Sequence, residues 1–215
     1  EKLFFLQRII AIMGNIPQFN TAMQQQMARL PRGTPLLLHV CCAPCASAVI
    51  ERLQDHFELV LYYYNPNIRP QAEHDRRYET LCALLRQMPA GTLGVRLLDA
   101  RYDPAPFDAA AQGLEAEPEG GARCTGCFDI RLRQSARKAA ELGIGWFTTT
   151  LTVSPHKNAA LLNSLGGEVA KQQGVQFLPC DFKKQDGYKR SIALSAQYGL
   201  YRQDYCGCAY SRREP

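Results

Sequence analysis

Five short apolar runs along the chain predict β-strands. The first of them, LLLHV, is apolar almost throughout, which is typical of a strand buried on both faces of a sheet. The predicted strands are residues 36–40, 57–64, 94–99, 146–151 and 175–179. Between these runs, apolar residues recur every three or four positions, which predicts helices. The predicted helices begin near Pro44 and cover residues 71–87 and 124–142. Strands that alternate with helices predict an α/β domain with a mainly parallel sheet flanked by helices.

The segments outside this alternation receive simpler predictions. Residues 1–33 are expected to form an N-terminal helical appendage with one helix over 21–30, and residues 34–215 a single α/β domain. Residues 101–123 are rich in Pro, Gly, Ala and Glu, which predicts a long loop with one short helix. The pair Ser154–Pro155 has the residue types of an N-cap and a first helical turn, so a helix is predicted to begin there.

Several polar and cysteine-rich segments directly follow the predicted strands. They are CCAPC (41–45), NPNIRP (65–70), TVSPHKN (152–158) and CDFKK (180–184). In an open parallel sheet, ligands bind at the carboxyl ends of the strands. The four segments are therefore expected to meet at one edge of the sheet and to form a site there.

Composition narrows the class of protein. The chain has 215 residues, of which 46% are hydrophobic and 21% charged, and this is an ordinary mix for a globular domain. No apolar run approaches the roughly 18 residues that a transmembrane helix needs, so no membrane association is expected. The net charge of +5 is compatible with an acidic partner but lies far from that of a dedicated nucleic-acid binder. Nine clustered cysteines in a chain of this size predict metal or redox chemistry in a reducing, cytoplasmic compartment.

Four of the cysteines have the positions expected of metal ligands. Cys41 and Cys42 lie between a strand and a helix, and Cys124 and Cys127 form a C-x-x-C pair at the start of another helix. Four thiolates can bind a zinc ion or an iron–sulfur cluster, and the adjacent Cys-Cys pair at a functional edge favours iron–sulfur. In the alternative interpretation, Cys41 and Cys42 are small buried apolar residues, which leaves the C-x-x-C pair unexplained.

Three further cysteines admit more than one role. Cys45 completes a C-A-P-C segment that also matches a thioredoxin-type redox motif. Cys206 and Cys208 flank Gly207, so they can form a strained, reducible disulfide, bind a metal, or be merely structural. Gly207 permits the unusual backbone geometry that such a short ring requires.

Polar residues beside these thiols are candidates for acid catalysis and substrate contact. Asp181 and His156 are the candidate general acids. The predicted substrate-binding residues follow strand ends or precede a helix; they are Asn65, Asn67, Arg69, Arg123 and Lys157. Neither a G-x-G-x-x-G fingerprint nor a phosphate-binding P-loop occurs in the sequence, so a bound dinucleotide or nucleoside triphosphate is not expected.

Taken together, these segments resemble the QueH-type epoxyqueuosine reductases. The motifs that carry the resemblance are LLLHVCCAPCAS, YYYNPNIRPQAEHDRRYE, GGARCTGCFDIRL, FTTTLTVSPHKN, DFKK and LYRQDYCGCAYS, and they extend from about Leu36 to Ser211. The resemblance implies a HUP-like Rossmannoid domain. It also implies reductive removal of the epoxide oxygen of epoxyqueuosine in tRNA, giving queuosine at the wobble position of the tRNAs for Asp, Asn, His and Tyr, the last step of queuosine biosynthesis.

The same resemblance implies a cofactor and a set of ligands. By motif, a [4Fe–4S] cluster is assigned to Cys41, Cys42, Cys124 and Cys127, and the C-x-C pair to Cys206 and Cys208. That pair is implied to be either a redox disulfide or the ligands of an additional iron. Electrons would come from an external one-electron donor, such as a ferredoxin or a flavodoxin.

Two other classes of protein remain open from the sequence. An iron–sulfur tRNA sulfur-transferase combines an α/β fold with cysteines, but it needs ATP, and the chain has no recognisable phosphate loop. A zinc-stabilised RNA-binding module without catalysis is the other. Iron against zinc content separates the second from a reductase.

Overall fold

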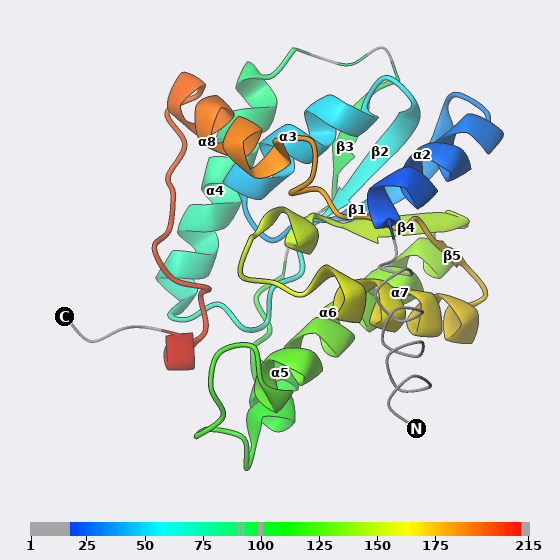
Figure 1. Cartoon of the computed structure of the whole chain (residues 1–215). Coiled ribbons are helices and arrows are strands. Elements are labelled where there is room, and N and C mark those ends of the chain that lie inside the picture. The colour runs from blue at the N-terminus through cyan, green and yellow to red at the C-terminus, as the bar shows by residue number, and fades with distance from the viewer. Residues whose placement is uncertain (1–17, 90, 92, 99–100, 212–215) are drawn as a thin grey trace, which may run out of the picture.

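A five-stranded parallel sheet forms the centre of the molecule, with helices on both of its faces (Figure 1). The computed structural model describes residues 18–89, 91, 93–98 and 101–211. The strands are β1 (Thr34–His39), β2 (Phe57–Tyr62), β3 (Val95–Leu97), β4 (Trp146–Thr149) and β5 (Gln176–Phe177). Their order across the sheet is β3-β2-β1-β4-β5, and every neighbouring pair is parallel. The predicted α/β fold is therefore confirmed, in a Rossmann-like arrangement.

The helices cover the sheet in two layers. One layer contains α2 (Phe19–Arg29), α3 (Ala43–Leu53), α4 (Gln71–Gln87) and α8 (Gly187–Gln197), with α8 packed on α3. The other contains α5 (Ala105–Ala111), α6 (Ala122–Glu141) and α7 (Ala159–Gln173), with α5 packed on α6. Two short 3-10 helices, η1 (Thr150–Val153) and η2 (Ala209–Ser211), complete the described elements. Among the described residues, none of the helices combines the length and the apolar composition needed to cross a membrane.

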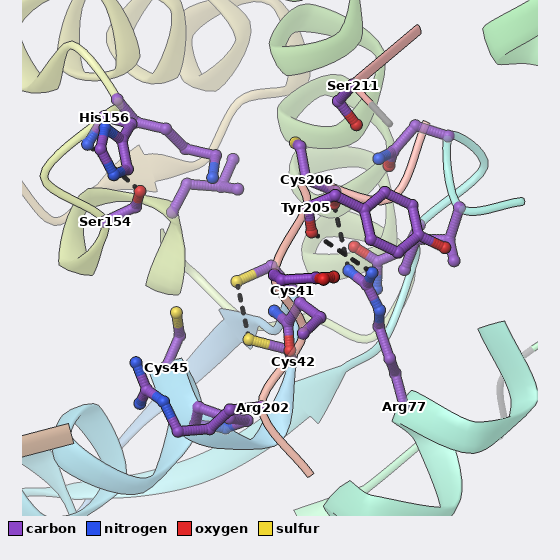
Figure 2. Close-up of a pocket in the computed structure, with 18 of the residues that line it drawn as sticks. Cys41, Cys42, Cys45, Arg77, Ser154, His156, Arg202, Tyr205, Cys206 and Ser211 are labelled. Atoms are coloured by element: carbon purple, nitrogen blue, oxygen red, sulfur yellow. Dashed lines mark hydrogen bonds between the residues drawn. The ribbon is translucent and has the colours of Figure 1, made fainter. Parts of the chain in front are cut away.

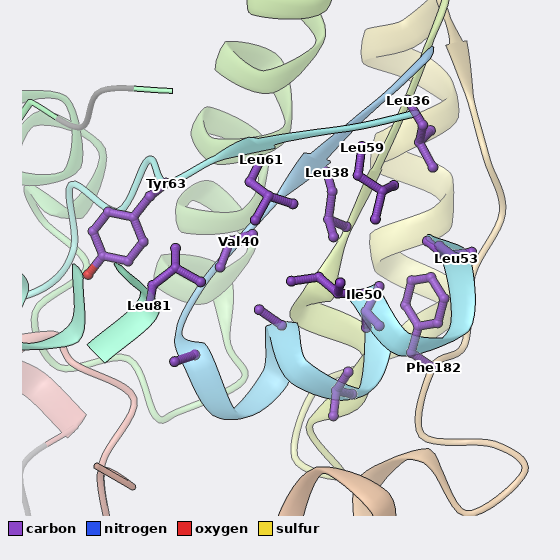
Figure 3. Close-up of a cluster of buried hydrophobic side chains, with 14 of the residues drawn as sticks. Leu36, Leu38, Val40, Ile50, Leu53, Leu59, Leu61, Tyr63, Leu81 and Phe182 are labelled. Carbon is purple, nitrogen blue, oxygen red and sulfur yellow. The ribbon is translucent and has the colours of Figure 1, made fainter. Parts of the chain in front are cut away.

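The central strand shows how the two layers are held together. Leu36 and Leu38 of β1 pack into the α3 side of the core, as Figure 3 shows, whereas Leu37 packs on the α6 side. All three leucines are fully buried. Since successive side chains of a strand point to opposite faces, an almost continuous apolar run is what a strand covered on both sides requires.

One predicted helix start differs from the structure, and one helix was not predicted. The pair Ser154–Pro155 does not begin a helix: α7 begins at Ala159, and the side chain of Asn158 is the cap, accepting a hydrogen bond from the Leu161 N–H at 3.1 Å. The hydroxyl of Ser154 instead accepts from the His156 N–H at 3.3 Å, so residues 154–157 form turns. The whole of α8 was missing from the prediction.

The predicted N-terminal appendage is only partly within the described residues. Its helix over 21–30 corresponds to α2, which packs into the main core through the fully buried side chain of Met23. Residues 1–17 lie outside the described residues, so the predicted domain boundary at residues 33 and 34 stays a prediction.

The topology places a crevice at the carboxyl end of β1. From β1 the chain continues to β2 and β3 on one side of the sheet and later to β4 and β5 on the other. Ligands bind where the strand order switches in this way. His39 ends β1 opposite Thr149 of β4, so the residues that follow these two positions lie at the switch point.

Candidate active site

A cavity of about 670 Å³ opens at this switch point, a size typical of small-molecule sites. Its walls come from the segments that follow β1, β2 and β4, from α4, α6 and α8, and from the C-terminal segment. Its thiol, amide, aromatic and charged lining residues include Cys41, Cys42, Cys45, Asn65, Asn67, Arg77, Glu119, Arg131, His156, Lys157, Tyr188, Arg202, Asp204 and Cys206. The prediction that the polar segments meet at one edge is confirmed for those after β1, β2 and β4, whereas no residue of the fourth segment, 180–184, lines this cavity.

A second cavity, of about 100 Å³, adjoins the first. Four thiols line it, namely those of Cys124, Cys127, Cys206 and Cys208. The two cavities have Asn67, Glu119, His156, Lys157 and Cys206 in common. The site therefore contains two groups of thiols, with Cys206 facing both cavities.

The first thiol group is formed by Cys41, Cys42 and Cys45, whose sulfur atoms all lie within 4.8 Å of one another. The Sγ atoms of Cys41 and Cys42 are 3.8 Å apart (Figure 2). Cys42 is the N-cap of α3, whose unpaired N–H groups and dipole favour negative charge. A tetrahedral ion with bonds of about 2.3 Å holds its sulfur ligands about 3.8 Å apart, so this group can bind a metal.

Hydrogen bonds and nearby cations make Cys41 the thiolate of this group. Contacts from Cys42 and Cys45, followed by the charges of Lys157 and Arg131, hold the pKa of Cys41 well below its usual range. The contact with Cys41 has the opposite effect on its partner and raises the pKa of Cys42 to about 11. Metal ligation uses the thiolate form, so Cys41 is prepared for it.

The second thiol group begins at the N-terminus of α6. Cys124 and Cys127 are three residues apart on this helix, which brings both side chains to one face. The Gly120 N–H donates to the Cys124 Sγ at 3.2 Å. Burial raises the pKa of Cys127 to about 12, although the Arg131 charge acts in the opposite direction. Cys127 and Cys208 belong to one small buried cluster, so the C-x-x-C and C-x-C motifs are in contact.

The C-x-C segment is held by backbone contacts. Arg77 of α4 donates to the carbonyl oxygens of Cys206 at 3.1 Å and Tyr205 at 3.4 Å (Figure 2). The Arg69 N–H donates to the Gly207 carbonyl at 2.8 Å. Gly207 has a φ of +120°, and a Cβ there would lie 3.0 Å from the Arg77 guanidinium. The prediction that Gly207 supplies an unusual backbone geometry is confirmed. All nine cysteines are free thiols in this structure.

The two asparagines of the N-P-N segment have different surroundings. The Asn65 amide is fully engaged: it donates to the Val40 carbonyl at 2.9 Å and accepts from Arg131 at 2.5 Å. Asn67 is only 1% exposed and lines both cavities, yet its Oδ1 atom accepts no hydrogen bond from any described residue. Asn67 therefore has the open acceptor that a ligand would meet, and Asn65 positions Arg131.

The other predicted polar residues are distributed unevenly around the cavities. His156 is exposed and lines both of them. Arg123 lines the second cavity, but its guanidinium donates to three carbonyl oxygens of the preceding loop. Arg69 forms an ion pair with Asp108 and lines neither cavity. Asp181 is buried, lies 2.7 Å from the Lys183 ammonium and also lines neither cavity.

Sequence reasoning missed three residues that organise the site. Thr150 accepts a hydrogen bond from the Cys41 N–H at 3.0 Å and donates to its Sγ at 3.3 Å. Arg77 orders the C-x-C segment, and Arg131 lies one helical turn after Cys127. The spacing of Arg131 from Cys124 and Cys127 was the available signal, because all three lie on one face of a helix.

Comparison with known proteins shows that the chain is similar to proteins of one family. The family model described as "Epoxyqueuosine reductase QueH" matches residues 36–214. A protein of that name from Streptococcus pyogenes serotype M1 is 41% identical over 214 residues, which are 97% of this chain and 84% of that protein. The protein of the same name from Staphylococcus epidermidis is 42% identical, over 82% of this chain and 75% of the length of that protein. The Thermotoga maritima protein is 32% identical over 83% of this chain and 91% of its own.

The matched region contains both thiol groups, the N-P-N segment and the C-x-C segment. On the fold, the site and these similarities together, the chain belongs to the QueH family of epoxyqueuosine reductases.

Proposed function

We propose that this protein reduces epoxyqueuosine in tRNA to queuosine, the last step of queuosine biosynthesis, at the wobble position of the tRNAs for Asp, Asn, His and Tyr. Its membership of the QueH family supports this activity. The structural observation that carries the proposal is the gathering of seven cysteine side chains, from three distant segments, around two adjoining cavities. Such a set suits redox chemistry better than the binding of RNA alone.

The reaction needs electrons, protons and a place for the oxygen. Converting an epoxide to an alkene and water consumes two electrons and two protons. When bound, a [4Fe–4S] cluster supplies electrons one at a time. We assign its ligands as Cys41, Cys42, Cys124 and Cys127, with Cys45 as an additional thiol of the first group. The sulfur-only donor set of the two groups fits such a cluster.

Cys206 and Cys208 are assigned to the reacting centre. Two roles are open to the pair, either as a dithiol that yields two electrons and two protons on forming a disulfide or as the ligands that would hold an additional iron. Either role requires a cysteine that reaches the substrate cavity and the second thiol group at once. Cys206 meets this requirement because it lines both cavities.

We assign the role of proton donor to His156. Its side chain is exposed and lines both cavities, so it can exchange protons with solvent and reach a bound substrate. Asp181 is the second candidate in the proposal. It pairs with Lys183 and lines neither cavity, so it would act on a substrate there only indirectly.

The larger cavity is assigned to the modified nucleoside. Bases in RNA loops are recognised singly, by stacking on aromatic rings and by hydrogen bonds to their edges. Tyr188 is 37% exposed and lines this cavity, as does the buried Asn67, whose Oδ1 has no partner among the described residues. The exposed Arg202 and the half-buried Lys157 are cations suited to phosphate or ribose contacts. Of the remaining residues assigned to substrate, Asn65, Arg69 and Arg123 would act through the loops they hold.

The proposal also includes the partners of the reaction. The electron source is an external one-electron donor of the ferredoxin or flavodoxin type. The protein would act in the cytoplasm, where its tRNA substrate and reduced thiols are found.

A single reconstitution experiment tests the activity. The protein is purified and reconstituted with iron and sulfide under anaerobic conditions, reduced, and incubated with tRNA that carries epoxyqueuosine. Mass analysis of the released nucleosides should show queuosine, and iron analysis about four or more irons per chain. The Cys206→Ser variant should keep the cluster's absorbance and lose turnover. The Cys82→Ser variant is the matched control, because Cys82 lies on α4 outside both cavities.

Other results would contradict the proposal. A colourless protein with one tightly bound zinc ion and no turnover would indicate the RNA-binding module. Incorporation of sulfur into tRNA in the presence of ATP would indicate the sulfur-transferase. Full activity of the Cys206→Ser variant would remove the assigned role of the C-x-C pair.

A further inference from the structure

Two cations in the site have no acidic partner among the described residues. The side chain of Arg131 is buried, with 2% of the residue exposed, and Lys157 is half-buried. The described residues form eight ion pairs, and neither cation takes part in any of them. Arg77, by contrast, is equally buried and pairs with Glu73. Since an uncompensated buried charge is costly, something else must balance Arg131 and Lys157.

The position of Arg131 indicates what balances it. It follows Cys127 by one helical turn on α6, and its guanidinium lines the larger cavity. One of its nitrogen atoms donates to the Asn65 oxygen, whereas its Nε–H, also buried, has no partner among the described residues. Its charge lowers the pKa of Cys41 and opposes the effect of burial on Cys127. Arg131 therefore faces a thiol of each group.

Lys157 approaches the same thiols from the loop that follows η1. It lines both cavities. Burial acts to lower the pKa of Lys157, but the charges of Cys206, Cys41 and Cys45 outweigh it, so the net pKa is raised. The ammonium therefore keeps its proton and stays positively charged.

The other ionisable residues near the thiols do not take the place of Arg131 and Lys157 as a source of buried positive charge, nor do they neutralise these two cations. Glu119 and Asp204, the acidic residues that line the larger cavity, are both exposed to solvent. His39 lines neither cavity, and its ring nitrogens contact the Thr149 hydroxyl at 2.8 Å and the Tyr64 carbonyl at 3.1 Å. Of the other cations that line the larger cavity, Arg77 is paired with Glu73 and Arg202 is exposed, so Arg131 and Lys157 are the cations left to balance the thiols.

We propose that Arg131 and Lys157 are the counter-charges of the thiolate-bound iron centre, positioning residues that favour its assembly and its reduced state. The assignment rests on the proposed function, because it needs iron at these thiols. A cluster bound by four thiolates is anionic, and one electron from the external donor makes it more so. A fixed cation in a medium of low dielectric stabilises the reduced form more than the oxidised form.

The test compares cluster potentials in matched variants. Lys157→Gln removes the charge, Lys157→Arg keeps it, and Lys171→Gln is the control, because Lys171 is an exposed cation on α7 outside both cavities. Each reconstituted protein is titrated under anaerobic conditions, with the cluster's spectrum as the readout. At a fixed potential, the ratio of reduced to oxidised cluster should fall about tenfold in Lys157→Gln, which corresponds to about 59 mV. It should stay near the wild-type value in Lys157→Arg and Lys171→Gln.

A second pair of variants tests the buried cation. Arg131→Met should lower the potential in the same direction, and Arg131→Lys should restore much of it. Far-UV circular dichroism shows whether each variant is folded. If the folded Lys157→Gln protein binds less iron than the wild type, the Lys157→Arg protein decides the meaning of that loss. Normal iron content in Lys157→Arg supports the assignment, and low iron content there contradicts it.

Two further outcomes separate failure of this assignment from failure of the proposed function. Iron-loaded Lys157→Gln and Arg131→Met proteins with the wild-type potential would overturn the assignment and leave the proposed function intact. A wild-type protein that takes up no iron would refute the proposed function and this assignment with it.

Discussion

The hydroxyl of Thr150 makes two hydrogen bonds to Cys41, one to its backbone and one to its sulfur. It accepts from the Cys41 N–H at 3.0 Å and donates to the Sγ at 3.3 Å. Cys41 ends the turn after β1, and Thr150 begins η1 after β4, so the contact spans the switch point of the sheet. One side chain thus fixes both the backbone and the thiolate of Cys41.

Replacing Thr150 with Val should damage the first thiol group without changing its shape. The substitution leaves the Cys41 N–H without its partner, which should lower the free energy of unfolding by about 1–3 kcal/mol. It also removes a hydrogen bond to the thiolate, so iron uptake should fall. Denaturant unfolding and iron analysis measure the two effects. Thr150→Ser keeps the hydroxyl and should retain both properties; equal losses in the two variants would show that the methyl group matters instead.

Gly207→Ala should disorder the C-x-C segment. The new Cβ would meet the Arg77 guanidinium and the Ile68 side chain, each at 3.0 Å, at a φ of +120°. We expect a loss of about 1–3 kcal/mol in the free energy of unfolding, together with loss of turnover. Gly113→Ala is the matched control, because Gly113 also has a positive φ but open space around it. If the two variants had the same activity, the close packing of Gly207 would be unimportant.

Arg77→Met should be far more harmful than the loss of an exposed ion pair. The buried Arg77 guanidinium is 2.7 Å from Glu73 and also holds two carbonyl groups of the C-x-C segment. Its removal leaves a carboxylate without its cation, which typically costs about 3–5 kcal/mol. Arg190→Met breaks the exposed pair with Glu51 and should cost less than about 1 kcal/mol. Thermal unfolding of the two variants tests this order, and a reversed order would contradict it.

The two asparagines of the N-P-N segment should respond in opposite ways to Leu. Asn65→Leu removes the bonds to Val40 and Arg131 and should destabilise the protein by about 2 kcal/mol or more. Asn67→Leu removes an oxygen that has no partner within the described protein, so stability should stay the same or rise. If that oxygen accepts from the substrate, the affinity for tRNA should fall about tenfold. Unchanged affinity in Asn67→Leu would remove Asn67 from the substrate site.

Local patterns were sufficient to predict most of the fold. The strand at β1 and the helix at α4 are clear in the sequence, because one is a continuous apolar run and the other has apolar residues at helical spacing. The start of α7 is not clear in the sequence, because both Ser154 and Asn158 are good cap residues. The folded structure decides between them: residues 154–157 form turns, and Asn158 is the cap. The helix α8 was missed because its apolar residues are sparse and its contacts are with α3, distant in sequence.

The site was predictable where it depends on topology and less so where it depends on side-chain direction. In a parallel sheet the carboxyl ends of the strands lie at one edge, so the residues after β1, β2 and β4 are expected to meet there. The structure confirms this expectation. The three close thiols of Cys41, Cys42 and Cys45 result from one tight turn into α3. The spacing indicated Cys45 as part of a thioredoxin-type motif but did not place it in one group with the predicted metal ligands. Asp181 follows β5, but its side chain turns to Lys183 instead of the cavity.

The attachment of the C-x-C segment to α4 has a consequence for how the protein matures. Cys41 and Cys124 precede Cys206 and Cys208 in the sequence, and the carbonyl groups of the later segment are bound by the Arg77 side chain and the Arg69 N–H. A growing polypeptide therefore exposes the earlier thiols before the later ones can cover them. The set of thiols around the two cavities is therefore complete only once this later segment has docked on α4.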